Sequence, residues 1–337
     1  MLPLNQVVLL IGLGLSFYVA WCLGANDAAN PTDCAVGSGV LSLRKALLIF
    51  CVFVAIGALA QGFMVIKTIG TGVVRNVTLL GSLTVVLSAC LWITFCTWKG
   101  LPVSTTHSIV GSVLGYGLVV YGLDGVRWGV FGAIGLSWVT SPLASAGLAF
   151  VLYRVVARVI PALPRSEQLT SGLLIFSLCF SAYAFGANDV GNATGVFLTV
   201  IKQVGQVPRS LVLLGLAILG SVGIAVGAFT WGYRVINTVG FRITRLDPVM
   251  GGAAELSNAL SVYLFTTIPY MVLGWGMPIS TTLASVGSII GVGVSKSLDT
   301  VSGGTVLRIV GAWVLTVPCA AGISAAIYLL LSPFLAV

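Results

Sequence analysis

Apolar runs long enough to cross a lipid bilayer recur from one end of this chain to the other. A helix needs roughly 20 apolar residues to span the hydrocarbon, and stretches such as 211–229 are apolar on every side. Only 7% of the residues are charged, against about 25% in a soluble domain. A membrane barrel would instead need short segments in which polar and apolar residues alternate. We therefore expect an all-α protein that crosses the membrane many times, with room for about ten crossings.

Basic residues indicate the topology. The net charge is +8, but Lys and Arg stand at the ends of apolar segments rather than in a patch with interleaved aromatic residues, so no nucleic-acid partner is expected. The positive-inside bias assigns the two most basic connections to the cytoplasmic side of a cell membrane. The arginines of these connections are Arg154, Arg158 and Arg165 in the first and Arg234, Arg242 and Arg245 in the second.

The cysteines and the first apolar run give no sign of a cofactor or of a removable segment. The cysteines are scattered through apolar stretches without a CxxC pair, so we interpret them as small core residues rather than as a metal or redox site. The first apolar run lacks a basic n-region and a small-residue cleavage site, so a membrane helix is expected there rather than a signal peptide. The cysteines are Cys22, Cys34, Cys51, Cys90, Cys96, Cys179 and Cys319.

Two motifs occur twice, in the same order. "GANDAAN" (24–30) recurs as "GANDVGN" (186–192), and "GLPVSTT" (100–106) recurs as "GMPISTT" (276–282). Polar residues in lipid-buried segments are costly, so their recurrence indicates that both copies act together at one site. Internal repeats with matching polar breaks are typical of secondary transporters.

The repeated motifs divide the chain into two homologous halves. We predict a first repeat at residues 1–160 and a second at 161–337, both contributing to one transport site. The division lies near the connection 158–168, which contains two prolines and several charged residues. Inverted repeats are our expectation, although the number of crossings in each half, which decides between inverted and parallel repeats, stays open.

Each GAND motif is expected to break a membrane helix at its glycine. Backbone groups freed by a break at membrane depth must find protein, water or a ligand, so a broken or re-entrant helix indicates a binding site. In a helix after the break, Asn26 and Asn30 share one face. Their oxygens and those of the neighbouring carboxylate are suitable ligands for a small cation. The predicted Na⁺ or proton ligands are Asp27, Asn30, Asp189 and Asn192.

The two Pro-x-Ser-Thr-Thr motifs have the form of a helix start. Proline precedes a capping serine, and the hydroxyls and unpaired first-turn N–H groups of such a start point in one direction. The positive end of the helix dipole favours an anion there, without a fixed positive charge inside the membrane. The predicted anion ligands are Ser104, Thr105, Thr106, Ser280, Thr281 and Thr282.

Charge counting links the anion to a cation. Asp27 and Asp189 bring negative charges into the hydrocarbon zone, an oxyanion adds more, and the motifs contain no Lys or Arg ligand. An unpaired buried charge costs several kcal/mol, so we expect the anion to bind together with Na⁺ or with protons. Glu255, with Asn258 one turn later, is a further carboxylate within an apolar stretch and is predicted as another cation ligand or proton acceptor.

Purely structural interpretations compete at several positions. An Asn-Asp pair can simply cap a helix, and Ser and Thr often hold membrane helices together by hydrogen bonds; the recurrence of both motifs favours binding. His107, which is replaced by Leu283 in the second motif, is expected to be structural. Asp33 has no acidic counterpart in the second half. We expect it on a solvated loop or helix face, with an extra ion ligand as the alternative.

The duplicated motifs resemble the signature of the inorganic phosphate transporter family. The resemblance spans nearly the whole chain, which is similar to the short prokaryotic members. It implies a dimeric, multi-pass symporter of a prokaryotic cytoplasmic membrane, built from two repeats. It also implies that phosphate is bound by Asn26, Asn188 and the Ser-Thr-Thr helix starts, and Na⁺ or H⁺ by the aspartates and nearby amides. Pro31, Thr32 and Asp33 depart from the small residues usual in the family.

The leading hypothesis is therefore a phosphate symporter that is coupled to Na⁺ or H⁺ and works by alternating access. A sulfate or thiosulfate permease of the same superfamily is the nearest alternative, because these tetrahedral anions fit the same donors. A passive anion channel is disfavoured, because the paired carboxylates would repel an anion that travelled alone. An intramembrane enzyme is also disfavoured, because equivalent settings for Asp27 and Asp189 do not suit the separate acid and base roles of catalysis.

Overall fold

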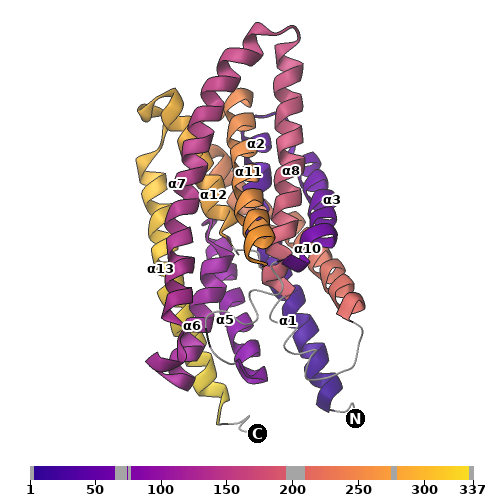
Figure 1. Ribbon diagram of the computed structural model, residues 1–337, viewed down its shortest axis with the longest axis vertical. Coiled ribbons are helices and arrows are strands. Elements are labelled where there is room, and N and C mark those ends of the chain that lie inside the picture. The colour runs from indigo at the N-terminus through magenta and orange to yellow at the C-terminus, as the bar shows by residue number, and fades with distance from the viewer. Residues whose placement is uncertain (1–3, 65–73, 75–76, 195–208, 275–278, 334–337) are drawn as a thin grey trace.

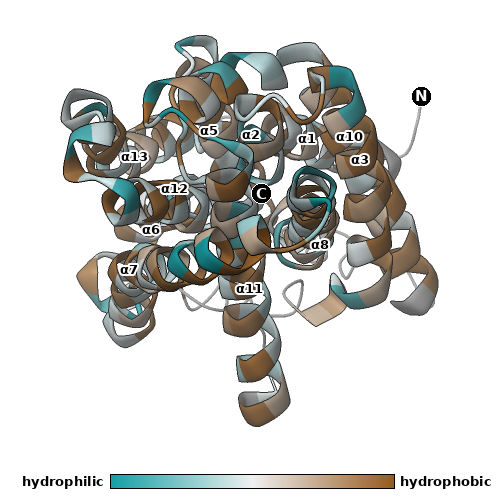
Figure 2. Cartoon of the chain, turned by 90° about the horizontal axis from the view of Figure 1, so that it is seen from above, coloured by the Kyte–Doolittle hydropathy of each residue, from teal (hydrophilic) through white to brown (hydrophobic). Residues whose placement is uncertain are grey.

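The structure of the protein, a computed structural model, describes residues 4–64, 74, 77–194, 209–274 and 279–333 (Figure 1). The described residues form a bundle of helices, with one isolated antiparallel bridge between Val74 and Val126. Hydrophobic residues cover most of the helices in the view along the bundle (Figure 2). The expected all-α fold is confirmed.

The helices divide between the two predicted repeats. Those of the first repeat are α1 (Leu4–Asp27), α2 (Ala29–Gly37), α3 (Leu43–Gln61), α5 (Leu79–Trp98), α6 (Thr105–Tyr121) and α7 (Trp128–Val159). Those of the second are α8 (Ser166–Thr194), α10 (Arg209–Arg242), α11 (Pro248–Leu273), α12 (Thr281–Lys296) and α13 (Gly303–Leu331).

Seven segments of the described chain are long and apolar enough to cross a membrane, which makes this a multi-pass membrane protein. They comprise the α1–α2 segment and helices α3, α5, α7, α8, α10 and α13. The sequence has room for more, but α6 and α12, with 17 and 16 residues, are shorter than the roughly 20 residues that a crossing needs. Both short helices begin at a Ser-Thr-Thr motif, and the side chains of both motifs are buried inside the bundle.

Helices of each half pack against helices of the other half. Helix α1 packs against α10, and α8, which carries the second GAND motif, packs against α3. The same kind of packing occurs on the other side of the bundle, where α7 packs against α12 and α13 packs against α6. Each of these pairs joins a helix of residues 1–160 to one of residues 161–337.

The corresponding helices of the two halves run in opposite directions. In Figure 1, α7 rises to the turn that leads into α8, whereas α13 descends toward the C-terminus. Helix α1 rises from the N-terminal end of the view, whereas α8 descends from the same upper turn. Matching helices are therefore antiparallel within the bundle.

The two connections that the sequence assigns to the cytoplasm lie at one end of the molecule. Ile160, Pro161 and Ser166 of the α7–α8 turn and residues 247–249 at the start of α11 line a common cavity. Lys296 at the end of α12 donates a hydrogen bond to Asp247 over 2.9 Å, which raises the pKa of Lys296 above its ordinary value. Arg234 differs from the expectation, because it lies within α10, where its guanidinium donates to the carbonyl oxygen of Trp98 at 3.2 Å.

Candidate functional site

The first GAND motif lies where α1 passes into α2. Helix α1 ends at Asp27 and α2 begins at Ala29, so the helix is broken at Ala28, whose own backbone is helical. We expected the break at Gly24, but it lies at Ala28. Gly24 instead serves helix packing. A Cβ atom on Gly24 would lie 1.9 Å from the carbonyl oxygen of Ile224 in α10. Gly24 therefore allows α1 and α10 to touch backbone to backbone.

The second GAND motif lies inside α8, which continues through it to Thr194. Gly186 is again a packing residue, since a Cβ atom there would lie 2.1 Å from the carbonyl oxygen of Val54 in α3. The break expected at this glycine is not present, because the residue fills the same role as Gly24 in the first repeat. The side chain of Asn192 lies outside the described residues.

The first asparagine of each motif is anchored to a threonine of the helix that precedes the Ser-Thr-Thr segment. The side-chain amide of Asn26 donates to Thr97 Oγ1 at 2.8 Å and to the carbonyl oxygen of Leu101 at 3.1 Å. Its oxygen accepts from the Val103 N–H at 3.1 Å. Asn188 donates to Thr266 Oγ1 at 2.6 Å. Asn26 thereby holds the segment that leads into α6, a structural contact that the sequence did not reveal.

Asp27 joins both Ser-Thr-Thr segments. It is fully buried, and its carboxylate accepts hydrogen bonds from Thr105 at 2.9 Å and from Thr282 at 3.2 Å. The charge of Asp189, also fully buried, acts on Asp27. The structure therefore brings the acidic residues of both motifs together with hydroxyls from both helix starts.

Asn30 faces the second helix start from α2. Its amide donates to Thr281 Oγ1 at 3.1 Å and to Thr282 Oγ1 at 3.2 Å. Its Oδ1 atom is buried and has no hydrogen-bond partner within the described residues. An amide oxygen of this kind is available as a ligand for a cation.

The two Ser-Thr-Thr segments start α6 and α12 in the same way and face each other. Ser104 and Ser280 cap the helices, accepting from the N–H groups of His107 at 3.1 Å and of Leu283 at 3.2 Å. Thr106 donates to the carbonyl oxygen of Ile279, and Thr282 lies within hydrogen-bond distance of that of Val103. The positive ends of two buried helices therefore converge, which is the electrostatic setting for an anion.

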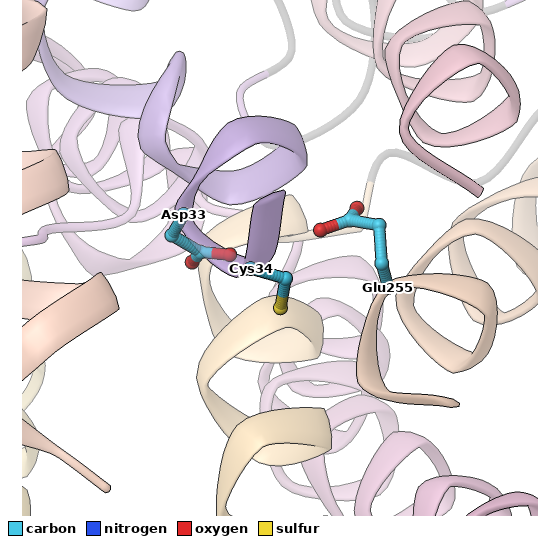
Figure 3. Close-up of side chains that lie close together, drawn as sticks. All are labelled: Asp33, Cys34 and Glu255. Atoms are coloured by element: carbon cyan, nitrogen blue, oxygen red, sulfur yellow. The ribbon is translucent and has the colours of Figure 1, made fainter. Parts of the chain in front are cut away.

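A second group of carboxylates lies beside this site (Figure 3). Glu255 of α11 is fully buried, and Asn258 donates to its Oε1 at 3.3 Å and to the carbonyl oxygen of Asn30 at 3.0 Å. Asp33, expected in a solvated position, is instead fully buried in α2 and accepts from Ser285 of α12 at 3.0 Å. Sequence reasoning undervalued Asp33 and Cys34; their place one turn after Asn30 was the available signal.

His107 follows the first helix start and packs as an internal residue. Its ring stacks on that of Trp138 in α7, with 3.8 Å between the ring centroids. The side chain is buried, and its Nδ1 atom has no hydrogen-bond partner in the described part of the chain. This packing agrees with a structural role.

Comparison with known proteins places the chain in a family. Residues 23–324 match the family described as the phosphate transporter family. The chain is 32% identical to a putative phosphate permease of Pyrococcus abyssi, over 96% of this chain and 98% of the relative. It is 29% identical to the chloroplastic inorganic phosphate transporter 2-1 of Arabidopsis thaliana, over 94% of this chain and 70% of the relative.

A solved structure supports the same assignment. This structure, described as "The sodium-dependent phosphate transporter", superposes with a TM-score of 0.85 at 31% identity and covers 98% of this chain and 100% of its own. The family resemblance inferred from the repeated motifs is confirmed. The chain belongs to the phosphate transporter family, as a multi-pass membrane protein of transport and not an enzyme.

Proposed function

We propose that the protein is a symporter that carries inorganic phosphate across the membrane together with Na⁺. The observation that carries the proposal is the position of the fully buried Asp27 carboxylate, which accepts hydrogen bonds from threonine hydroxyls of both helix starts. The ion pair found within the described residues joins Lys296 to Asp247, and both of these side chains are exposed. A phosphate at the helix starts would thus meet buried negative charge with no cationic side chain to balance it.

The proposed phosphate ligands are the hydroxyls of the two helix starts with the leading asparagine of each GAND motif. They are Asn26, Ser104, Thr105, Thr106, Asn188, Ser280, Thr281 and Thr282. The two amide protons of Asn26 are donated to Thr97 and Leu101, so Asn26 would have to release one of these bonds to donate to phosphate. Thr105 and Thr282 each have one hydroxyl proton, and both now donate to Asp27. When phosphate takes these donors, Asp27 loses them and needs a new positive partner. This exchange of donors couples anion binding to cation binding.

The proposed cation ligands are oxygens of the two motifs and of α11. They are Asp27, Asn30, Asp189 and Asn192, with Glu255 and Asn258 at a further position. Na⁺ suits a set of carboxylate and amide oxygens, and the similar solved structure is that of a transporter described as sodium-dependent. A proton on a carboxylate is the alternative coupling ion, and no other cofactor is required.

We further propose that the halves, residues 1–160 and 161–337, are inverted repeats that work by alternating access around this site. The antiparallel course of α7 and α13 and the packing of helices of each half against those of the other support the inversion. Inverted repeats with a central site are the usual architecture for such transport. The homodimer implied by the family stays a prediction.

Uptake of labelled phosphate into proteoliposomes tests the proposal. An inward Na⁺ gradient should drive phosphate above its equilibrium concentration, and a proton gradient should do so if H⁺ is the coupling ion. Labelled sulfate is the matched competitor, because a tetrahedral anion of similar size fits the same hydroxyls. Downhill flux without accumulation would indicate a channel, and accumulation of sulfate but not phosphate would replace the substrate.

A further inference from the structure

Helices α2 and α11 bring two carboxylates and a thiol to one point. Asp33, Cys34 and Glu255 each offer one ligand atom, and these three atoms lie within 4.8 Å of one another. In Figure 3 the two carboxyl groups point toward each other from the two helices, with the Cys34 side chain beside them. Asp33 and Glu255 are fully buried, and Cys34 is 1% exposed. We propose that these residues form a binding site for a thiophilic divalent cation such as Zn²⁺.

Each carboxyl group has one oxygen held by the protein and one left over. Ser285 donates to Asp33 Oδ2 at 3.0 Å, and Asn258 donates to Glu255 Oε1 at 3.3 Å. Asp33 Oδ1 and Glu255 Oε2 are buried without a hydrogen-bond partner in the described part of the chain. A buried polar atom without a partner carries its full desolvation cost. The neighbouring side chains thus orient the carboxyl groups, as outer partners do at metal sites, and leave ligand atoms unused.

The charge of the group favours a divalent cation. Two carboxylates supply two negative charges. Asp33 contacts α12 through Ser285, but the lysine of this helix, Lys296, lies at its C-terminal end and pairs with Asp247 instead. A shared proton satisfies at most two oxygens, whereas a metal ion contacts all of its ligands at once. The positive N-terminal end of α12 near Ser285 offsets the charge that remains when the Cys34 thiol releases its proton on coordination.

The sulfur decides which divalent cation fits. Carboxylate oxygens alone suit Mg²⁺ or Ca²⁺, but a cysteine ligand selects thiophilic ions such as Zn²⁺ and Cd²⁺. Three protein ligands are also the number found at zinc sites that keep a further position open. The site is distinct from the anion site, although Glu255 is shared with the proposed coupling-ion ligands. A bound divalent ion would therefore exclude the coupling cation from Glu255.

Metal binding by the purified, full-length protein tests the site without any transport measurement. The protein is purified in the presence of Co²⁺, and the metal content per chain is measured together with the thiolate-to-cobalt absorption band. The wild-type protein should hold cobalt and show the band. Cys34→Ser should abolish the band, and Asp33→Asn should lower the affinity by more than the roughly 10–100-fold that loss of an outer partner costs.

Cys179→Ser is the matched control, because Cys179 is a partly exposed cysteine of α8 that does not belong to the group. It should keep both cobalt and the band. Failure of the wild-type protein to bind cobalt, or a band that survives Cys34→Ser, would overturn the proposal. Loss of the band in the Cys179→Ser variant as well as in Cys34→Ser would also overturn it, because the signal would then not report this site.

Inhibition of phosphate uptake is a second test, and it alone rests on the proposed function. Cd²⁺ should inhibit the wild-type transporter, and Cys34→Ser should raise the half-inhibiting concentration by about tenfold or more, each variant being compared with its own uptake without Cd²⁺. Equal sensitivity in the two proteins would contradict the assignment. If no protein accumulates phosphate, the proposed function fails while the cobalt result still decides the metal site.

Discussion

The two predicted repeats share their framework and differ in their charges. In both, a GAND glycine touches a backbone carbonyl of the other half, a leading asparagine is held by a threonine, and a serine caps the short helix. Asp33 and Glu255 break this equivalence. Asp33 belongs to the first repeat and Glu255 to the second, yet both face the same point. The predicted duplication thus matches the shared framework of the site, whereas the additional acidic group lies where the two halves differ.

The glycine contacts should be the most sensitive common feature. Gly24→Ala and Gly186→Ala place a Cβ atom 1.9 Å and 2.1 Å from a backbone oxygen, and overpacking of this kind costs about 1–3 kcal/mol or more. Both variants should lose most of their folded, monodisperse protein in detergent, as measured by size-exclusion chromatography after heating. Gly147→Ala, with no atom within 4 Å of its Cβ, is the control. A stable Gly186→Ala beside an unstable Gly24→Ala would break the equivalence of the repeats.

The aspartates should control the response to cations. Asp27→Asn and Asp189→Asn remove a buried negative charge, so the Na⁺ concentration for half-maximal phosphate uptake should rise by about 5–150-fold, the range of typical coupling energies. Asp299→Asn, at an exposed turn, is the matched control. Sodium titration of uptake measures all three. Unchanged sodium dependence in both aspartate variants would remove these side chains from the coupling site.

Single hydroxyls should have a smaller effect, mainly on the anion. Thr105→Ala and Thr281→Ala each remove one donor, worth about 1–1.5 kcal/mol, so the half-saturating phosphate concentration should rise by about tenfold. Thr140→Ala, on the exposed face of α7, should leave it unchanged. Kinetics of uptake at saturating Na⁺ measure the effect. A change for Thr105 alone would show that the two helix starts contribute unequally.

The smallest effect is expected at the ends of the short helices, where the repeats also differ. Helix α12 ends at Lys296, which pairs with Asp247, whereas α6 ends at Tyr121. Because both partners are about 40% exposed, Lys296→Met should lower the free energy of unfolding by less than about 1 kcal/mol. The pKa of Lys296 is raised in the folded state, so its contribution is complete below the unfolded pKa of about 10.4. The contribution of Lys296 to stability is lost as the pH rises through its higher folded pKa. Thermal unfolding of the wild-type protein and of Lys296→Met at pH 7 and at pH 11 measures the difference in stability between the two proteins.

Sequence patterns predicted the helical membrane fold, the capping serines and the interior position of the GAND and Ser-Thr-Thr motifs, because apolar length and duplication are local signals. The position of Asp33 was not predictable in this way. Its burial depends on Ser285, 252 residues away in the chain, and no repeat copy supported it. The prediction of helix breaks at Gly24 and Gly186 was wrong for a similar reason. Only the neighbouring helices show that these glycines allow close backbone contact.

The backbone contacts of Gly24 and Gly186 also limit how such a molecule can change shape. They fasten α1 to α10 and α8 to α3, and each fastening crosses from one half of the sequence to the other. Sliding at these seams would drive carbonyl oxygens into α-carbons, since no side chain is present to yield. If the protein works by the proposed alternating access, we expect each rigid unit to contain helices of both halves, so that the moving boundary differs from the predicted boundary between the repeats.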